Sequence, residues 1–359
     1  MGNWLLYGAY GFTGRLIVEE AVNRGHKPVL AGRNEAKTKA VAEAFGLDHI
    51  SSDLSDTDRL NQIVADFDLV LHAAGPFIHT SEPMIQACLA GKTHYLDITG
   101  EIPVFETTFS YDTHAREQGI ALISGVGFDI VPTDCMAKYV SEHLPNATEL
   151  EMAIGGISVA SAGTTKTMLE LTPTMSKGSM IRRNGRYEQV PIGEGKRDIQ
   201  FSSGKTRTVV PVPWGDLATA ERATGIPNVT VYMAISVPRG ATTLAPLTSR
   251  LLAFAPIRSL AKKAVELTVK GPDEKTRHTA RSYVWACAKD AEGNQKEAWL
   301  ETIEAYQLTA VASLLAVEKT LAHRPIGSLS PSMAFGADFV LEVDGTERFD
   351  TLAIHDVAT

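Results

Sequence analysis

Short apolar runs alternate with amphipathic stretches through the first third of the chain. Short apolar runs between glycine and polar residues predict buried strands, and a 3.6-residue period predicts helices. The expected strands are residues 4–7, 28–31, a third that begins at 49–50, 69–74, 95–96 and 120–123. The expected helices are residues 15–23, 35–45, 81–90 and 103–118, with another from a capping box at 55–58 to about residue 66. Six strands that alternate with helices predict a doubly wound parallel sheet, the Rossmann type of α/β fold.

The pattern changes after residue 130. Pro132 suits the first turn of a new helix to about residue 143, and strand-like runs follow at 149–155, 206–212, 229–237 and 280–288. Between them lie an expected helix at 164–177 and a hairpin-like stretch at 180–189. We therefore expect a Rossmann dinucleotide-binding domain at 1–130. A second α/β domain on a mixed sheet, for substrate or dimerisation, is expected at 131–359. The apolar helix at 304–321 is expected to pack back on the first domain.

A glycine ladder follows the first expected strand. Its spacing is G-x-x-G-x-x-G, and it opens the first helix. Glycines in a strand–turn–helix unit let the backbone approach a pyrophosphate, and the helix N-terminus supplies N–H donors. A glycine-rich turn in an α/β domain without a nucleotide is the alternative. The expected cofactor contacts are Gly8, Tyr10, Gly11, Phe12, Thr13 and Gly14.

The end of the second strand indicates which dinucleotide binds. An NAD site usually places a carboxylate there for the ribose 2′-hydroxyl, but this chain has Arg33 and Asn34, with Lys37 one helical turn on. A guanidinium can stack on adenine and pair with a 2′-phosphate. The residues favour NADP(H) over NAD(H). An Arg33 that merely starts a solvated helix is the alternative.

Two further segments are candidates for cofactor contact. Asp53 follows the third strand, where it is placed to meet the adenine amino group or, equally, to cap a turn. Small residues after the fourth strand would let the cofactor lie close to the sheet, and an aromatic ring would wall the ribose or nicotinamide side. A simple strand-to-helix turn is the alternative. These residues are Ala74, Gly75, Pro76 and Phe77.

Composition narrows the class of protein. The chain has 359 residues, enough for two domains, and a formal net charge of −8 that argues against a nucleic-acid partner. Its three cysteines have no metal-ligand spacing, so we expect no metal site and a reducing compartment. There is no secretory signal pattern and no apolar run of about 18 residues. The expectation is a cytoplasmic protein with a small-molecule substrate, and a homodimer is the commonest state for such an architecture.

Candidate catalytic groups follow the fifth and sixth strands. Asp97, Glu101 and Asp129 stand where the carboxyl edge of such a sheet places reactive residues. A partly desolvated carboxyl there can donate a proton after hydride transfer. Helix capping or a domain-interface salt bridge is the alternative for each, and His72 suits a buried core position. No tyrosine has a lysine four residues on, and no H-E-x-x-H or G-x-S-x-G motif occurs.

The segment 240–270 combines a helical apolar pattern with five basic residues and one acidic residue, Glu266. A basic amphipathic helix binds a membrane surface or an acyl chain, so peripheral membrane contact through 244–270 is one interpretation. The other is a helix that covers the sheet or forms a dimer contact.

Several blocks together resemble the saccharopine dehydrogenase-like NADP-binding proteins, a family that includes bacterial trans-acting enoyl reductases. The similar stretches span nearly the whole chain, and the block at 95–101 is the most specific of them. They are residues 8–14, 31–34, 74–77, 91–101, 271–274 with Arg281, and Gly327 with Pro331 and 335–339. The resemblance implies a Rossmann domain, an α/β domain on a mixed sheet and a pyridine-nucleotide reductase. The block at 127–134 departs from the domain junction of the saccharopine reductases after Pro132, which disfavours an amino-acid substrate.

The sequence thus predicts an NADPH-dependent reductase that transfers hydride to a polarised double bond in an interdomain cleft. The resemblance and the segment 240–270 favour the C=C bond of an enoyl or lipid-type substrate. A saccharopine-type imine reductase is one alternative, with Arg182, Arg183 and Arg207 available for carboxylates. A non-catalytic nucleotide-binding protein associated with lipid or with a partner is the other.

Overall fold

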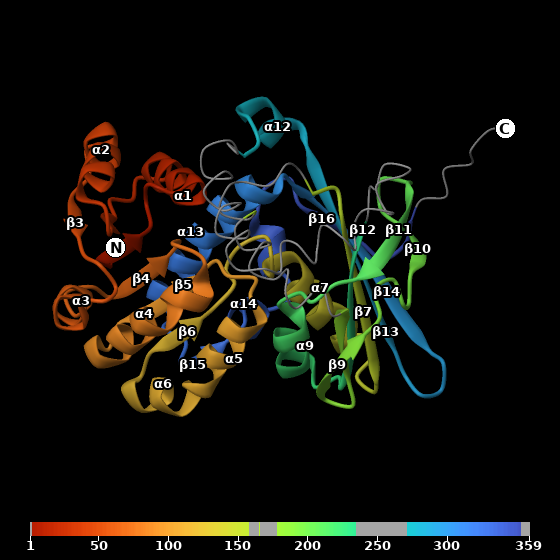
Figure 1. Cartoon of the computed structure of the whole chain (residues 1–359). Helices are drawn as coiled ribbons and strands as arrows, with labels where there is room; N and C mark the ends of the chain where they lie inside the picture. The colour runs from red at the N-terminus through yellow and green to blue at the C-terminus, as the bar shows by residue number, and fades with distance from the viewer. Residues whose placement is uncertain (1, 158–164, 166–177, 235–270, 353–359) are drawn as a thin grey trace. The chain divides into compact units, whose positions relative to one another are not determined.

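The computed structural model describes residues 2–157, 165, 178–234 and 271–352 (Figure 1). The chain forms two compact units. Unit 1 comprises Met1–Cys135 and Ala305–Val343, and unit 2 comprises Met136–Glu304 and Asp344–Thr359. The division therefore differs from a single cut at residue 130, because a late segment returns to unit 1. Apart from residue 165, the helix expected at 164–177 lies outside the described residues, and so does the segment 240–270.

Unit 1 contains a parallel sheet of seven strands among the described residues. The order β15-β6-β5-β4-β1-β2-β3 includes the 3-2-1-4-5-6 arrangement of a doubly wound dinucleotide fold, which confirms the predicted fold class. All pairs in it are parallel. The strands are β1 (Trp4–Tyr7), β2 (Val29–Gly32), β3 (His49–Ser51), β4 (Leu69–His72), β5 (His94–Asp97), β6 (Ala121–Ile123) and β15 (Gly327–Leu329).

Strand β15 was not predicted. It has three residues and pairs with β6, far away in the sequence. Gly327 N–H donates to the Ile120 carbonyl at 2.9 Å, and Ser328 N–H donates to Asp112 Oδ1 at 2.7 Å. These tertiary partners define the strand, because three residues carry no periodicity of their own.

The helices of unit 1 form two groups by their contacts (Figure 1). Helix α1 (Phe12–Asn23) packs against α2 (Glu35–Phe45) and α13 (Ala305–His323). The second group is α3 (Thr57–Val64), α4 (Phe77–Gly91), α5 (Ile102–Ser110) and α6 (Asp112–Gln118). Helix α7 (Val131–Glu142) begins in unit 1, and α14 (Pro331–Phe335) and the 3-10 turn η2 (Phe339–Glu342) follow β15. Two expectations need correction: α4 begins at Phe77 rather than at 81, and the stretch 103–118 forms two helices that meet at Tyr111.

Unit 2 is built on a mixed sheet, as predicted. Its strand order is β10-β11-β12-β7-β13-β14-β16, with the hairpin β8–β9 paired to β12. Among the described strands of this second sheet, only β7 and β12 pair in parallel. The strands are β7 (Glu149–Gly155), β8 (Ser179–Arg183), β9 (Arg186–Val190), β10 (Arg197–Gln200), β11 (Thr206–Pro211), β12 (Asn228–Ala234), β13 (Arg281–Lys289), β14 (Gln295–Ile303) and β16 (Glu347–Phe349). Its described helices are α9 (Asp216–Thr224), α12 (Glu274–Thr279) and the larger part of α7.

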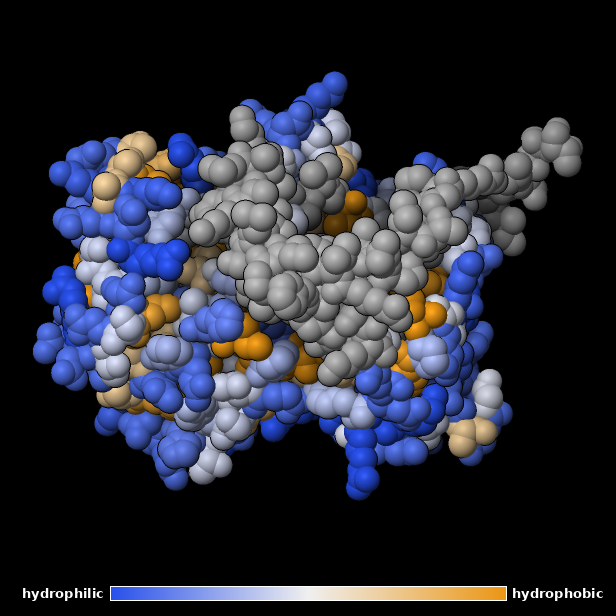
Figure 2. Space-filling view, in the orientation of Figure 1, coloured by the Kyte–Doolittle hydropathy of each residue, from blue (hydrophilic) through white to orange (hydrophobic). Residues whose placement is uncertain are grey.

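Hydrophilic residues dominate the described surface of the face drawn in Figure 2. Large exposed hydrophobic side chains among the described residues are few and separated in sequence: Ile78, Ile157, Tyr187, Ile192 and Ile326. No helix within the described ranges combines the length and the apolar character needed to cross a bilayer. The same part of the chain holds no cluster of three His, Cys, Asp or Glu side chains placed to bind a metal ion.

Candidate active site

The glycine loop after β1 is close-packed against the loop after β4. Gly8 has φ +97°, and a Cβ on it would lie 2.8 Å from backbone atoms of Ala73 and Ala74. A Cβ on Gly14 would collide with the Gly8 carbonyl oxygen. Gly8 N–H donates to the Ala31 carbonyl at 2.8 Å, and Gly11 N–H donates to the Gly8 carbonyl at 3.0 Å. The backbone conformation therefore requires glycine at 8 and 14, as a close diphosphate cradle does.

The first turn of α1 completes this cradle. The helix begins at Phe12, with Gly11 as its N-cap residue, so Phe12 and Thr13 lie in that turn. A helix N-terminus directs N–H groups and the positive end of the helix dipole at an anion. The ring of Phe12 packs edge-on against Tyr306 of α13, with the ring centroids 5.1 Å apart. The Phe12 side chain is thus engaged in packing, and its backbone is the part suited to a phosphate.

Basic and aromatic residues gather at the carboxyl end of β2. Arg33 is exposed directly after the strand. The Lys37 ammonium lies 5.9 Å from the centroid of the Tyr10 ring, and a Cβ on Gly32 would be 2.6 Å from that ring. Asn34 caps α2 by accepting from Lys37 N–H at 3.0 Å. Arg33 and Lys37 fit a 2′-phosphate, whereas Asn34 has a structural task.

Asp53 is held in a local turn. Its Oδ1 accepts from the Ser55 N–H at 3.0 Å and from the Ser55 hydroxyl at 2.7 Å. These two hydrogen bonds lower the pKa of Asp53, and the nearby charge of Arg33 adds to the effect. The contacts are those of the turn-capping alternative, and they place the carboxylate within electrostatic reach of Arg33.

The loop after β4 is joined to the loop after β5 through Glu101. Its Oε1 accepts from Phe77 N–H at 3.0 Å and its Oε2 accepts from Ile78 N–H at 2.8 Å. Both carboxylate oxygens therefore cap the first turn of α4, a helix other than their own. The Phe77 ring is buried and lies edge-on to His72, with the centroids 5.4 Å apart. Phe77 and Glu101 thus take the strand-to-helix and capping roles that the sequence left as alternatives.

Asp97 is fully buried and accepts four hydrogen bonds. Its Oδ1 accepts from Thr99 N–H and Gly125 N–H, each at 2.9 Å. Its Oδ2 accepts from the hydroxyls of Tyr95 and Ser124, each at 2.8 Å. Burial raises the pKa of Asp97, and the four donors oppose that shift by stabilising the carboxylate. These contacts make Asp97 a brace between the ends of β5 and β6 rather than an accessible proton donor.

Asp129 differs from Asp97 in its surroundings. It is half-buried after β6, and a Cβ on Gly100 would lie 3.0 Å from its Oδ2. Burial raises the pKa of Asp129 to about 6, and the like charge of Glu101 adds to the rise. A carboxyl with such a pKa stays partly protonated near neutral pH, as a general acid must. Of the three candidate acids, Asp129 has the most suitable environment.

Some contacts near the carboxyl edge of this sheet were not predicted from the sequence. Tyr7 donates its hydroxyl to the Ser52 carbonyl at 3.0 Å, and Thr309 of α13 accepts from Phe128 N–H at 3.0 Å. His72 is fully buried as expected, 3.0 Å from the Thr80 hydroxyl, and burial lowers its pKa to about 3. Thr309 lies 181 residues from its partner, so no local pattern could have identified this contact.

The glycine cradle, the strand order and the basic end of β2 define a Rossmann dinucleotide-binding domain. Residues 4–123 match the family model described as the saccharopine dehydrogenase NADP binding domain. This match confirms the predicted resemblance for that segment and identifies the cofactor as a nicotinamide dinucleotide.

Relatives and solved structures extend the comparison. A trans-acting enoyl reductase of Mycobacterium bovis is 31% identical over 138 residues, which cover 36% of this chain and 33% of that protein. A lipid droplet localized protein of Caenorhabditis elegans is 29% identical over 186 residues, 46% of this chain and 43% of that protein. The chain thus matches less than half of the length of these relatives. Apo saccharopine dehydrogenase (L-Glu forming) from Saccharomyces cerevisiae has the same fold over 95% of this chain and 96% of its own, with a TM-score of 0.64 and 14% identity.

Proposed function

We propose that this protein is an NADPH-dependent reductase that acts on a polarised double bond, and that its substrate is an enoyl or other lipid-type compound. The glycine cradle with Arg33 beside it is the observation that carries the cofactor half of the proposal. The names of the mycobacterial and nematode relatives support the substrate half.

In this proposal, separate residues at the carboxyl edge of the sheet bind the cofactor and donate the proton. The glycine loop and the first turn of α1 would hold the diphosphate, and Arg33 with Lys37 would hold the 2′-phosphate. NADPH, when bound, supplies a hydride. Asp129 donates the proton that completes reduction of the double bond, and it is re-protonated from solvent afterwards. Burial, together with the charge of Glu101, raises the pKa of Asp129 and keeps its carboxyl partly protonated. Asp97 fixes the two loops that carry these groups.

The imine-reductase alternative has less support. It needs cationic side chains of unit 2 for substrate carboxylates, but two of the candidates already have carboxylate partners. Arg182 pairs with Glu221, and Arg183 Nη1 lies 2.6 Å from Glu188 Oε1. We therefore rank a C=C substrate above an imine that bears several carboxylates.

The primary experiment has two stages on purified protein. Fluorescence titration with NADPH is expected to saturate well below millimolar ligand. Anaerobic NADPH consumption is then followed with enoyl thioesters, ketones and preformed imines, and turnover with the thioesters is expected to be fastest. A folded sample that does not bind NADPH contradicts the cofactor assignment. Binding without turnover on any of the three contradicts the enzymatic one.

A non-catalytic lipid-associated protein is the second candidate, favoured by the name of the nematode relative. Liposome flotation of the wild type against a Leu251→Glu, Leu252→Glu variant tests it. Flotation that the variant loses, together with no turnover, would replace the reductase proposal. Homodimer formation and a cytoplasmic location belong to the same proposal, and sedimentation analysis and cell fractionation test them.

A further inference from the structure

A cavity lies at the amino edge of the parallel sheet of unit 1, away from the glycine loop. It has a volume of about 260 Å³. His94 is the first residue of β5 and Asp68 directly precedes β4, so the cavity opens where these strands start. All strands of this sheet run in parallel, and the glycine loop and Asp129 follow the ends of strands, so they lie at the opposite, carboxyl edge and the two sites are separate. The lining residues are Ala65, Asp66, Phe67, Asp68, Gly91, Lys92, His94 and Arg324.

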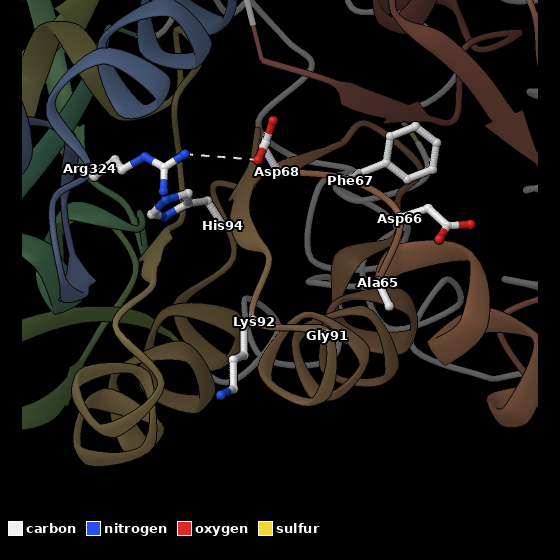
Figure 3. Close-up of a pocket in the computed structure, with 8 residues that line it drawn as sticks. All are labelled: Ala65, Asp66, Phe67, Asp68, Gly91, Lys92, His94 and Arg324. Carbon is white, nitrogen blue, oxygen red and sulfur yellow. Dashed lines mark ion pairs between the residues drawn. The ribbon is translucent and has the colours of Figure 1, made fainter.

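Three polar side chains converge in this cavity. Figure 3 shows the Arg324 guanidinium directed at Asp68, with the His94 imidazole beside it, whereas the Lys92 and Asp66 side chains point away. The Arg324 Nη2 and Asp68 Oδ1 atoms are 3.9 Å apart, a loose ion pair, and the Arg324 side chain is 68% exposed. A guanidinium has five N–H donors, so a pair this long leaves it able to bind another acceptor.

His94 adds a fixed donor. The residue is buried, and its Nδ1 accepts from Ala121 N–H at 2.9 Å. The neutral ring therefore carries its proton on Nε2, the nitrogen left for the cavity. Burial and the positive charge of Arg324 lower the pKa of His94, which keeps the ring neutral near pH 7. Nε2–H is thus a hydrogen-bond donor that does not need to be charged.

Asp68 supplies a hydrogen-bond acceptor, its carboxylate, whereas Arg324 and His94 supply donors. Its Oδ2 accepts from Asn3 N–H at 2.9 Å, which anchors the side chain, and Oδ1 is the atom closest to Arg324. A ligand that fits all three groups must present oxygen acceptors to Arg324 and His94 and an O–H donor to Asp68. Hydrogen phosphate has both at neutral pH, whereas sulfate has only acceptors.

Two residues that line the cavity end helices in a left-handed conformation. Arg324 has φ +46° and Lys92 has φ +56°, and these are two of the three non-glycine residues with positive φ in the described ranges. Lys92 directly follows α4 and Arg324 directly follows α13, and a left-handed residue commonly ends a helix. Three residues after Arg324, Gly327 N–H donates to the Ile120 carbonyl as β15 joins the sheet. Addition of β15 therefore positions the guanidinium over the cavity.

We propose that this cavity binds free hydrogen phosphate between Arg324, His94 and Asp68. Arg324 and His94 donate to the phosphate oxygens, and the phosphate O–H donates to Asp68. The site is independent of the proposed reductase reaction, because neither the glycine loop nor Asp129 contributes to it.

Calorimetric titration of the whole protein with inorganic phosphate, glycerol 3-phosphate and sodium sulfate tests this at matched ionic strength and with saturating NADPH. Phosphate is expected to bind at least about tenfold more tightly than sulfate or the ester, because sulfate and the ester dianion have no proton for Asp68. Tighter binding of the ester than of phosphate would contradict this role of the phosphate O–H. Equal affinity for phosphate and sulfate would overturn the proposal, and so would the absence of phosphate binding at millimolar concentration.

Three variants locate the site. Arg324→Gln is expected to weaken phosphate binding at least about tenfold, whereas Lys92→Gln, which removes a charge that points away, is the matched control and should bind normally. Asp68→Asn should reverse the preference towards sulfate, because the amide offers a donor in place of the carboxylate acceptor. Phosphate binding that Arg324→Gln leaves intact belongs to another place and refutes the assignment. NADPH binding, measured separately on each variant, reports on the reductase proposal and not on this one.

Discussion

Asp97 at the end of β5 and Asp129 in the loop after β6 each present a carboxyl at the same edge of the sheet, but the two groups are held in opposite ways. Asp97 is enclosed by four neutral hydrogen-bond donors. Asp129 lies against Gly100 and close to the negative charge of Glu101. The donors around Asp97 stabilise a loop, whereas the surroundings of Asp129 make ionisation of its carboxyl unfavourable. Position at a strand end is therefore not enough to identify an acid catalyst, since the local donors decide which role a carboxyl has.

The largest effect is expected when the Asp97 carboxylate, which joins the ends of β5 and β6, is removed. Asp97→Ala leaves four buried donors without their acceptor, so the free energy of unfolding should fall by about 3–5 kcal/mol. Asp97→Asn should cost less, because an amide can still accept from N–H groups and donate to the Tyr95 and Ser124 hydroxyls. Urea denaturation measures both variants. A loss below about 1 kcal/mol for Asp97→Ala would contradict the bracing role.

A substitution of Asp129, in the loop after β6, should change the catalytic rate. Asp129→Asn is expected to lower kcat by about 100-fold or more at saturating NADPH, because an amide cannot supply a proton. In the wild type, kcat/KM should fall as the pH rises above the Asp129 pKa of about 6, and the variant should lose this dependence. Steady-state rates between pH 5 and 9 provide the measurement, with NADPH affinity as the control. An unchanged profile in the variant would assign the proton to another group.

The loop after β2 carries Arg33, which is expected to bind the 2′-phosphate of NADPH. Arg33→Ala should weaken NADPH binding by about 1.5–3 kcal/mol, the usual strength of a charge-assisted hydrogen bond, and should affect NADH far less. Fluorescence titration with both nucleotides measures the difference. Equal losses for NADPH and NADH would mean that Arg33 stacks on adenine without binding the 2′-phosphate.

Stability should change in opposite directions at the two carboxyls. Because the pKa of Asp129 is raised to about 6, its ionisation destabilises the folded state as the pH rises through that value. Asp129→Asn should therefore gain about 1–2 kcal/mol at pH 8 and gain little at pH 4. Thermal unfolding at the two pH values tests this. A gain of the same size at both would trace the effect to packing instead of charge.

The smallest effect is expected for Glu101, which joins the loops after β4 and β5. Glu101→Gln removes the like charge beside Asp129, so the pKa in the activity profile should shift down by less than about one unit. The amide can still accept from one of the two α4 N–H groups, so the fold should survive. A pH profile that does not move would show that burial alone sets the Asp129 pKa.

Much of unit 1 was predictable because its signals are local. Asn34 and Gly46 bound α2 by capping and by a left-handed residue, and the structure has the helix at Glu35–Phe45, the predicted range. The glycines at 8 and 14 signal close backbone approach, and the structure shows the collisions that any side chain would cause there. Turn chemistry and periodicity act over a few residues, so a sequence shows them directly.

The amino-acid sequence by itself thus determined the order of strands and helices in the first 123 residues and the dinucleotide cradle between β1 and α1. Only the tertiary structure decided that Asp97 is a brace, that Glu101 caps a neighbouring helix, and that β15 joins β6 and brings Arg324 to the amino edge. The reason is physical. Local conformation follows from neighbouring residues, whereas the pKa and the role of a side chain depend on donors and charges that folding brings from distant parts of the chain.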